Sequence, residues 1–295
     1  MDRQGGCLTA DQCRTILGEV KIPLDELMVR LLPLAVRFAR VPVSGFPVGA
    51  VVKAQEATGT GFGLYLGANL EFIGQSLESA VHAEQAAVLN AWHHDAHDLT
   101  VLAVTAPPCG YCRQFLSELA HAESLTLHIA QDAADAASGC SLRSLLPHPF
   151  GPRDLDQLPG FMVADAEPQP LELKSPSAIS PEDPLVRGAL AAAAASYAPY
   201  TRNWAGCGIE SAAGKGESRF IFGRYAESAA FNPSVGPFRT ALVNLNLHAP
   251  AADYRLRRVV LVEHPTAASQ RRSTESLLES LAPQLNLEYV EAQLP

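Results

Sequence analysis

Two short motifs in this chain carry side chains whose types and spacing fit a catalytic metal centre. One is a His-x-Glu motif at residues 82–84, and the other is a Pro-Cys-x-x-Cys motif at residues 108–112. One imidazole and two thiolates give three protein ligands for Zn²⁺, and a catalytic zinc site keeps its fourth position for water. His82, Cys109 and Cys112 are therefore the candidate zinc ligands.

A site of this kind favours hydrolysis. Zinc lowers the pKa of water from about 16 to ~7 and so supplies hydroxide at neutral pH. Glu84 stands two residues from His82 and faces differently, which suits proton transfer rather than ligation. Two alternatives stay open from the residues alone: a structural zinc completed by Cys140 or His121, and a redox pair of the two cysteines.

The elements that must position these residues alternate between strands and helices. The apolar pattern predicts helix over residues 10–40, strands at 48–54 and 63–66, a helix at 81–92, a strand at 100–105, a helix at 110–120 and a strand at 125–129. This alternation predicts an α/β sheet with helices packed on it. Both motifs fall where the chain enters a helix, whose positive end lowers the pKa of a thiol.

The second half of the chain repeats the first. Residues 67–71 resemble residues 223–227, and residues 42–49 resemble residues 199–206. We expect an N-terminal helical segment at 1–44, a catalytic zinc domain at 45–146, a linker at 147–184 and a degenerate copy at 185–295. In that copy we align Phe238 with His82 and Thr240 with Glu84, and place the cysteine positions near Thr266 and Ser269. These residues cannot replace the zinc ligands, so we expect one zinc per chain.

The composition restricts the class of substrate. The net charge is -9, from 22 Lys+Arg and 31 Asp+Glu, which disfavours a polymeric nucleic acid as the substrate. The N-terminus carries no apolar signal segment, and no apolar stretch is long enough to span a bilayer. Six cysteines are too few for a disulfide scaffold in 295 residues. We expect a cytoplasmic protein without a membrane partner.

His-x-Glu followed by Pro-Cys-x-x-Cys is the signature of the zinc deaminases. With the Gly-Ala-Asn-Leu-Glu-Phe run at 67–72, the chain resembles the cytidine deaminase family, in its dimeric form with a catalytic domain and a degenerate copy. The resemblance implies a duplicated three-layer α/β/α sandwich with a mixed sheet, plus N-terminal helices. It also implies hydrolytic deamination of cytidine and deoxycytidine by zinc-bound hydroxide in pyrimidine salvage, with Glu84 as the proton shuttle.

The resemblance further assigns substrate contacts. Asn69 and Glu71 match the positions that hold the ribose hydroxyls, Phe46 matches the aromatic residue beside the pyrimidine, and the backbone N–H of Ala83 is a candidate base contact. It also implies a homodimer with a shared active site. In that dimer Glu227 and residues 229–233 would contribute to the partner's site.

Three other functions are weighed against this one. A deoxycytidylate deaminase needs basic groups for the phosphate, whereas the sugar loop here offers Glu71. A nucleic-acid cytosine deaminase needs a basic, aromatic-rich groove. A non-enzymatic interaction module built on structural zinc needs four protein ligands.

Overall fold

The computed structural model describes residues 5–58, 61–130, 139–158, 160–174, 179–213, 217–248 and 255–295. The chain forms two compact units, and each includes a short segment from the other part of the sequence. The first unit comprises residues 1–71, 80–166 and 228–233, and the second comprises residues 72–79, 167–227 and 234–295. The chain passes from one unit to the other at Ala166 and Glu167, inside the predicted linker.

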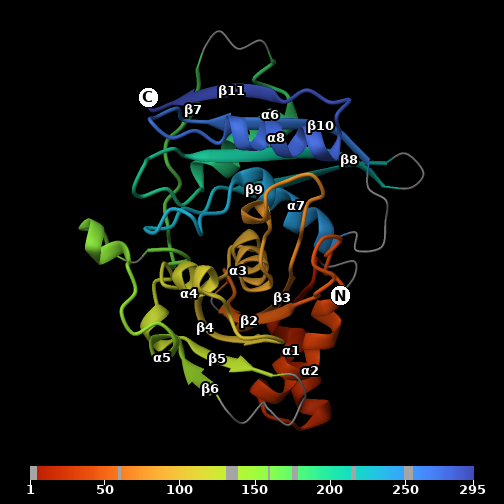
Figure 1. Cartoon of the computed structure of the whole chain (residues 1–295), viewed down its shortest axis with the longest axis vertical. Coiled ribbons are helices and arrows are strands. Elements are labelled where there is room, and N and C mark those ends of the chain that lie inside the picture. Colours follow the sequence, from red (N-terminus) through yellow and green to blue (C-terminus); the bar gives the residue numbers. More distant parts are fainter. Residues whose placement is uncertain are drawn as a thin grey trace. The chain divides into compact units, whose positions relative to one another are not determined.

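The first unit is built on a six-stranded mixed sheet of order β1-β3-β2-β4-β5-β6 (Figure 1). Its strands are β1 (Cys7–Leu8), β2 (Gly49–Gln55), β3 (Phe62–Ala68), β4 (His97–Val104), β5 (Thr126–Ile129) and β6 (Gly139–Ser141). Only β4 and β5 pair in parallel, and the other neighbours are antiparallel. β2 and β3 are buried along nearly their whole length, as expected for central strands covered on both faces.

Helices cover both faces of this sheet. They are α1 (Ala10–Val20), α2 (Leu24–Val36), α3 (Ala83–His93), α4 (Gly110–Leu116) and α5 (Leu142–Leu145), with short 3₁₀ turns at Ala122–Ser124 and Pro152–Leu155. The helix predicted over residues 10–40 is in fact two helices. α1 ends at Val20, its C-cap residue Lys21 has a left-handed φ of 52°, and α2 follows Pro23.

Two glycines show that α2 and α3 lie on opposite faces. A Cβ on Gly49 would lie 2.7 Å from the backbone N of Val36 in α2, and one on Gly67 would lie 2.0 Å from the backbone N of Ala87 in α3. Gly67 pairs with Ala50, the residue after Gly49, and neighbours along a strand face opposite sides. The unit therefore has three layers, as predicted, and each glycine permits a close helix approach that a side chain would block.

The second unit repeats this architecture. Its strands are β7 (Glu172–Leu173), β8 (Ala205–Ala213), β9 (Glu217–Arg224), β10 (Arg255–Glu263) and β11 (Glu288–Gln293), in the order β7-β11-β10-β8-β9. Its helices are α6 (Pro184–Ala194), α7 (Pro237–His248) and α8 (Arg271–Leu281). Residues 72–79, which also belong to this unit, hold a 3₁₀ turn at Leu77–Ser79. A Cβ on Gly206 would meet Ala193 of α6, and one on Gly223 would meet Ala241 of α7. The predicted duplication is confirmed.

The two copies align differently from the sequence-based alignment around the zinc motif. Asn90 Nδ2 of α3 donates to Leu66 O at 2.9 Å, and Asn244 Nδ2 of α7 donates to Phe222 O at 2.8 Å. These bonds place Asn244 at the position of Asn90. α3 follows His82 and α7 follows Gly236.

Gly236 thus occupies the position of His82, and Phe238 occupies that of Glu84. The alignment of Phe238 with His82 and of Thr240 with Glu84 was wrong by two residues. The cause is a shorter strand–helix connection in the second copy, residues 225–236 against residues 69–82. Glycine offers no ligand atom, so the expectation that this copy lacks a zinc site is unaffected.

In the part of the chain that the structure describes, no helix is both long and apolar enough to cross a membrane.

Candidate zinc centre and substrate pocket

Two helix N-termini present the metal-binding side chains. His82 is the N-cap residue of α3 and Cys109 is the N-cap residue of α4, both with extended backbone. Cys112 follows in the first turn of α4. The ligand atoms of His82, Cys109 and Cys112 all lie within 4.8 Å of one another. The structure therefore brings together the three residues that the two motifs predicted, on elements far apart in the sequence.

The donor set fits a zinc ion. Cys109 Sγ lies 3.4 Å from His82 Nδ1 and 3.7 Å from Cys112 Sγ, so one ion with ligand bonds of about 2.0–2.3 Å could bind all three. Imidazole and thiolate ligands suit zinc and exclude the hard cations Mg²⁺ and Ca²⁺. Cys112 is buried and Cys109 is exposed, so the cluster opens to solvent on one side.

Hydrogen bonds within the cluster favour a thiolate. A hydrogen bond from Cys112, reinforced by His82, lowers the pKa of the Cys109 thiol. The same hydrogen bond, together with burial, raises the pKa of Cys112. The hydrogen bond with Cys109 also raises the pKa of His82. One thiol of the pair is thus deprotonated readily, as ligation of a metal requires.

The predicted substrate residues meet at this cluster. A cavity of about 320 Å³ lies in the first unit. It is lined by Ser44, Phe46, Val48, Asn69, Glu71, Ala80, Val81, His82, Ala83, Glu84, Ala106, Pro107 and Cys109. All the predicted site residues except Cys112 are in this set. The other lining residues were not predicted, because backbone and small side chains leave no motif in a sequence; they are Ser44, Val48, Ala80, Val81, Ala106 and Pro107.

Glu84 lies in the first turn of α3 with 4% of its surface exposed. Burial raises the pKa of its carboxyl group, because the charged form loses solvation. A buried carboxyl group beside the cluster therefore keeps its proton to a higher pH than an exposed one, as a proton-transfer group can use.

Asn69 and Glu71 hold the loop that carries Phe46. Asn69 Oδ1 accepts from Val48 N at 2.9 Å, and its Nδ2 donates to Phe46 O at 3.0 Å. Glu71 Oε2 accepts from the backbone N of Val43 at 3.0 Å and of Ser44 at 2.9 Å. Burial opposes ionisation of Glu71, but the bonds from Ser44 and Val43 outweigh it and lower its pKa. Sequence reasoning missed this second use of both side chains.

Phe46 lines the cavity with 63% of its surface exposed. The ring is thus available to cover an aromatic ligand in the cavity.

The second copy keeps the loop bonds of Glu71. Glu227 Oε2 accepts from the backbone N of Tyr200 at 2.9 Å and of Thr201 at 3.2 Å, as Glu71 does in the first copy. Glu227 is buried, and its carboxylate holds the Tyr200–Thr201 loop of its own unit. Where the first copy has Phe46, the second has Asn203, which is buried and bonded to Glu263.

A fourth protein ligand is not found among the described residues. His121 Nε2 instead lies 2.9 Å from Asp98 Oδ1, and Cys140 lies on β6 outside the metal-binding group. The structural-zinc alternative therefore lacks the ligand it needs in the described chain. The duplicated fold and this three-ligand group define a zinc deaminase.

Comparison with known proteins agrees with that class. The family region described as "Cytidine and deoxycytidylate deaminase zinc-binding region" matches residues 23–134 and again residues 142–275. A cytidine deaminase of Photobacterium profundum is 35% identical over 97% of this chain and 89% of its own length. One of Aeromonas salmonicida is 39% identical over 95% of this chain and 88% of its own.

A solved cytidine deaminase structure from Mycobacterium tuberculosis is 27% identical, with a TM-score of 0.36, and covers 44% of this chain and 99% of that one. From the relatives that match over nearly the full length, the chain belongs to the cytidine deaminase family.

Proposed function

We propose that this chain converts cytidine and deoxycytidine, with water, into uridine and deoxyuridine plus ammonia. The observation that carries the proposal is the cavity in which the zinc-binding group, Glu84, Asn69 and Glu71 meet. Family membership supports the same reaction, because the relatives are cytidine deaminases. For the domains we propose a catalytic part at 45–146, packed with the N-terminal helices in the first unit, a linker at 147–184 whose first residues belong to that unit, and a degenerate part at 185–295.

His82, Cys109 and Cys112 would hold the zinc, one ion per chain. When bound, the ion supplies Lewis acidity that makes water a nucleophile at neutral pH. The open side of the cluster at Cys109 faces the cavity, so water and substrate can reach the same point.

Glu84 moves the protons. It takes a proton from the attacking water and delivers it to ring N3, while a C–O bond forms at C4 of the base. The remaining proton of the water then passes through Glu84 to the exocyclic amine, and the C4–N bond breaks to release ammonia. Burial of Glu84 suits this role, because it raises the pKa of the carboxyl group and so favours its protonated form between the two transfers.

The other pocket residues orient the nucleoside. We assign the ribose hydroxyls to Asn69 and Glu71 and the face of the pyrimidine to Phe46. Ala83 is the first residue of α3, and the N–H groups of a first helical turn have no partner within the helix. Its N–H is thus placed to donate to a base oxygen.

The charge of the pocket favours a nucleoside over a nucleotide. Glu71 is ionised at neutral pH, and a phosphate beside it would be repelled. The chain's net charge of -9 likewise disfavours nucleic acid as a substrate. We propose that the protein acts on free nucleosides in pyrimidine salvage, and we propose a cytoplasmic location with no nucleic-acid or membrane partner.

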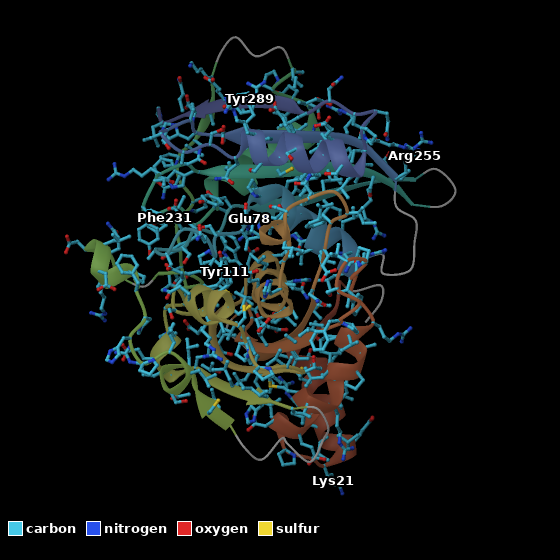
Figure 2. All side chains as sticks on the ribbon, in the orientation of Figure 1. Lys21, Glu78, Tyr111, Phe231, Arg255 and Tyr289 are labelled. Atoms are coloured by element: carbon cyan, nitrogen blue, oxygen red, sulfur yellow. The ribbon has the colours of Figure 1, made fainter. Side chains whose placement is uncertain are left out.

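We further propose a homodimer in which the degenerate half completes the partner's site. In residues 228–233, Ser228 and Ala229 are buried, whereas Phe231 is 62% exposed (labelled in Figure 2). Phe231 also has a positive φ of 61°, which turns the loop at its tip. Residues 229–233 were expected to contribute to the partner's site. Within this segment, the exposed tip at Phe231 and Asn232 is accessible to a second copy of the chain.

Substrate competition tests the reaction. Purified protein is given cytidine, deoxycytidine, deoxycytidine monophosphate and a single-stranded cytosine-containing oligonucleotide, and pyrimidine product and ammonia are measured. We expect each of the two nucleosides to give its pyrimidine product and ammonia in equal amounts. A higher specificity constant for the monophosphate or the oligonucleotide would replace the proposal with one of those activities. No turnover of any of them by zinc-loaded protein would favour the non-enzymatic module.

Mixing two variants tests the shared site. A Glu84→Gln chain and a Phe231→Asp chain are each expected to be nearly inactive. Heterodimers of the two contain one site with both residues intact, so co-refolding should restore a fraction of the activity. Sites contained within single chains would give no such recovery.

A further inference from the structure

A segment from the second half of the sequence lies within the first unit. Residues 228–233 belong to that unit, although the residues on both sides of them belong to the second. The segment is bonded at both ends, to Glu118 at its start and to Gln85 at its end. These two side chains lie on, or directly after, the two helices that carry the zinc ligands.

Gln85 links the segment to the His82 end of the cluster. Its Oε1 accepts from His82 N at 3.1 Å, and its Nε2 donates to Pro233 O at 2.9 Å. The side chain is 5% exposed, so both bonds are shielded from water. One amide therefore ties the backbone of a zinc ligand directly to Pro233.

Glu118 links the segment to the cysteine end. Its Oε1 accepts from Ala229 N at 2.7 Å and from Ser228 Oγ at 3.3 Å, and Glu118 is fully buried. Glu118 N donates to Phe115 O of α4, so the residue is held against the end of the helix whose N-cap is Cys109. Hydrogen bonds that backbone N–H groups donate to a buried carboxylate are among the stronger hydrogen bonds in proteins.

We propose that Gln85 and Glu118 are positioning residues which use residues 228–233 as a brace between α3 and α4, and so hold the zinc ligands at binding distance. The inference rests on the zinc site of the proposed function. It gives the degenerate half a role in its own chain, separate from any contribution to a partner. The base of the segment braces the site, and the exposed tip at Phe231 is left for other contacts.

Gln85→Glu separates this role from simple capping. A glutamate still accepts from His82 N, as in an ordinary capping box, but cannot donate to Pro233 O. The added negative charge would by itself strengthen cation binding, so faster zinc loss could not come from a weaker attraction for the ion and would point to the lost contact with Pro233 O. Glu118→Leu removes both bonds to the segment, and Glu118→Gln keeps an acceptor for Ala229 N and serves as the partial rescue.

Gln85→Glu and Glu118→Gln each have a control with the same chemical change elsewhere. Gln75 Nε2 donates to Ser276 O at 3.0 Å in the second unit, so Gln75→Glu matches Gln85→Glu. Glu56 Oε1 accepts from Ala10 N at 2.7 Å in the first unit, so Glu56→Gln matches Glu118→Gln.

The measurement is the rate at which zinc passes from the full-length protein to a chromophoric chelator, with kcat and KM for cytidine followed in parallel. Residues that support metal ligands typically change affinity about 10-fold or more when replaced. We expect zinc release about 10-fold faster in Gln85→Glu, faster again in Glu118→Leu and intermediate in Glu118→Gln, with both controls at the wild-type rate.

Unchanged release in Gln85→Glu overturns the proposal, and so does an equal acceleration in the controls, which would indicate general destabilisation. If Glu118→Leu does not fold, Gln85→Glu still decides. Zinc release does not depend on turnover, so a wild-type protein that bound zinc without deaminating cytidine would refute the proposed function and leave this test intact.

Discussion

Asn69→Ala should separate two roles of the Asn69 amide, which are to hold the loop that carries Phe46 and to bind the ribose. In the structure Asn69 makes two hydrogen bonds to the loop that carries Phe46, at 2.9 Å to Val48 N and 3.0 Å to Phe46 O. Each amide atom has capacity for one further bond, which the proposed ribose contact would use. The variant loses both kinds of interaction.

The two losses differ in size. A hydrogen bond of this kind contributes about 0.5–1.5 kcal/mol, so the two loop bonds amount to about 2 kcal/mol, or about 30-fold in kcat/KM if the loop must be ordered to bind substrate. A ribose hydroxyl contact adds about 1 kcal/mol, or about 5-fold. We expect a fall of about 150-fold with cytidine, mainly in KM.

The assay compares cytidine with 2′,3′-dideoxycytidine, each relative to wild type. Without the hydroxyls only the loop effect remains, so Asn69→Ala should lower kcat/KM for the dideoxynucleoside by about 30-fold. Equal falls on the two substrates would refute the ribose contact. Wild-type kinetics on the dideoxynucleoside would refute the loop-positioning argument.

Three further outcomes follow from the structure. Glu84→Gln should keep the fold and the zinc but lose at least about 10²–10⁴-fold in kcat, since an amide cannot shuttle protons. Metal analysis and kcat measured on the same sample check this prediction, and activity within about tenfold of wild type would exclude Glu84 as the proton shuttle. Cytidine monophosphate should have a specificity constant about 100-fold below that of cytidine, because Glu71 would repel the phosphate; comparable constants would contradict this. Burial opposes ionisation of Asp183, but hydrogen bonds from Arg258 and from Leu185 N at the start of α6 outweigh it and lower the pKa of the carboxyl group. The ionised carboxylate therefore stabilises the folded protein above the ordinary pKa of about 3.9, and this stabilisation is lost as the pH falls through the pKa of the folded state. Asp183→Asn should therefore lower the free energy of unfolding by about 1–2 kcal/mol at pH 7, and in urea unfolding this difference should shrink as the pH falls below the ordinary pKa.

The sequence predicted the zinc cluster because its ligands lie at helix N-termini, and such positions have local signals. Each motif marks its own helix start, and α3 and α4 begin at Ala83 and Gly110. The strands β2, β3 and β4 were placed to within a few residues, because buried central strands leave continuous apolar runs.

Other features could not be predicted because they depend on distant parts of the chain. The bonds of Glu118 to Ala229 and of Gln85 to Pro233 join residues far apart in sequence, and no local pattern marks them. The misalignment of Phe238 came from a connection whose length differs between the copies. The short edge strands β1 and β6 went unpredicted, since two or three residues carry too little periodicity.

Zinc titration of chelator-treated protein tests the account most directly. Aliquots of zinc are added to the full-length chain, and cytidine loss and uridine formation are measured at each step. The account predicts that activity rises in proportion to added zinc and stops rising at one zinc per chain. Cytidine turnover that persists without zinc, or a protein with one bound zinc that leaves cytidine unchanged, would contradict it.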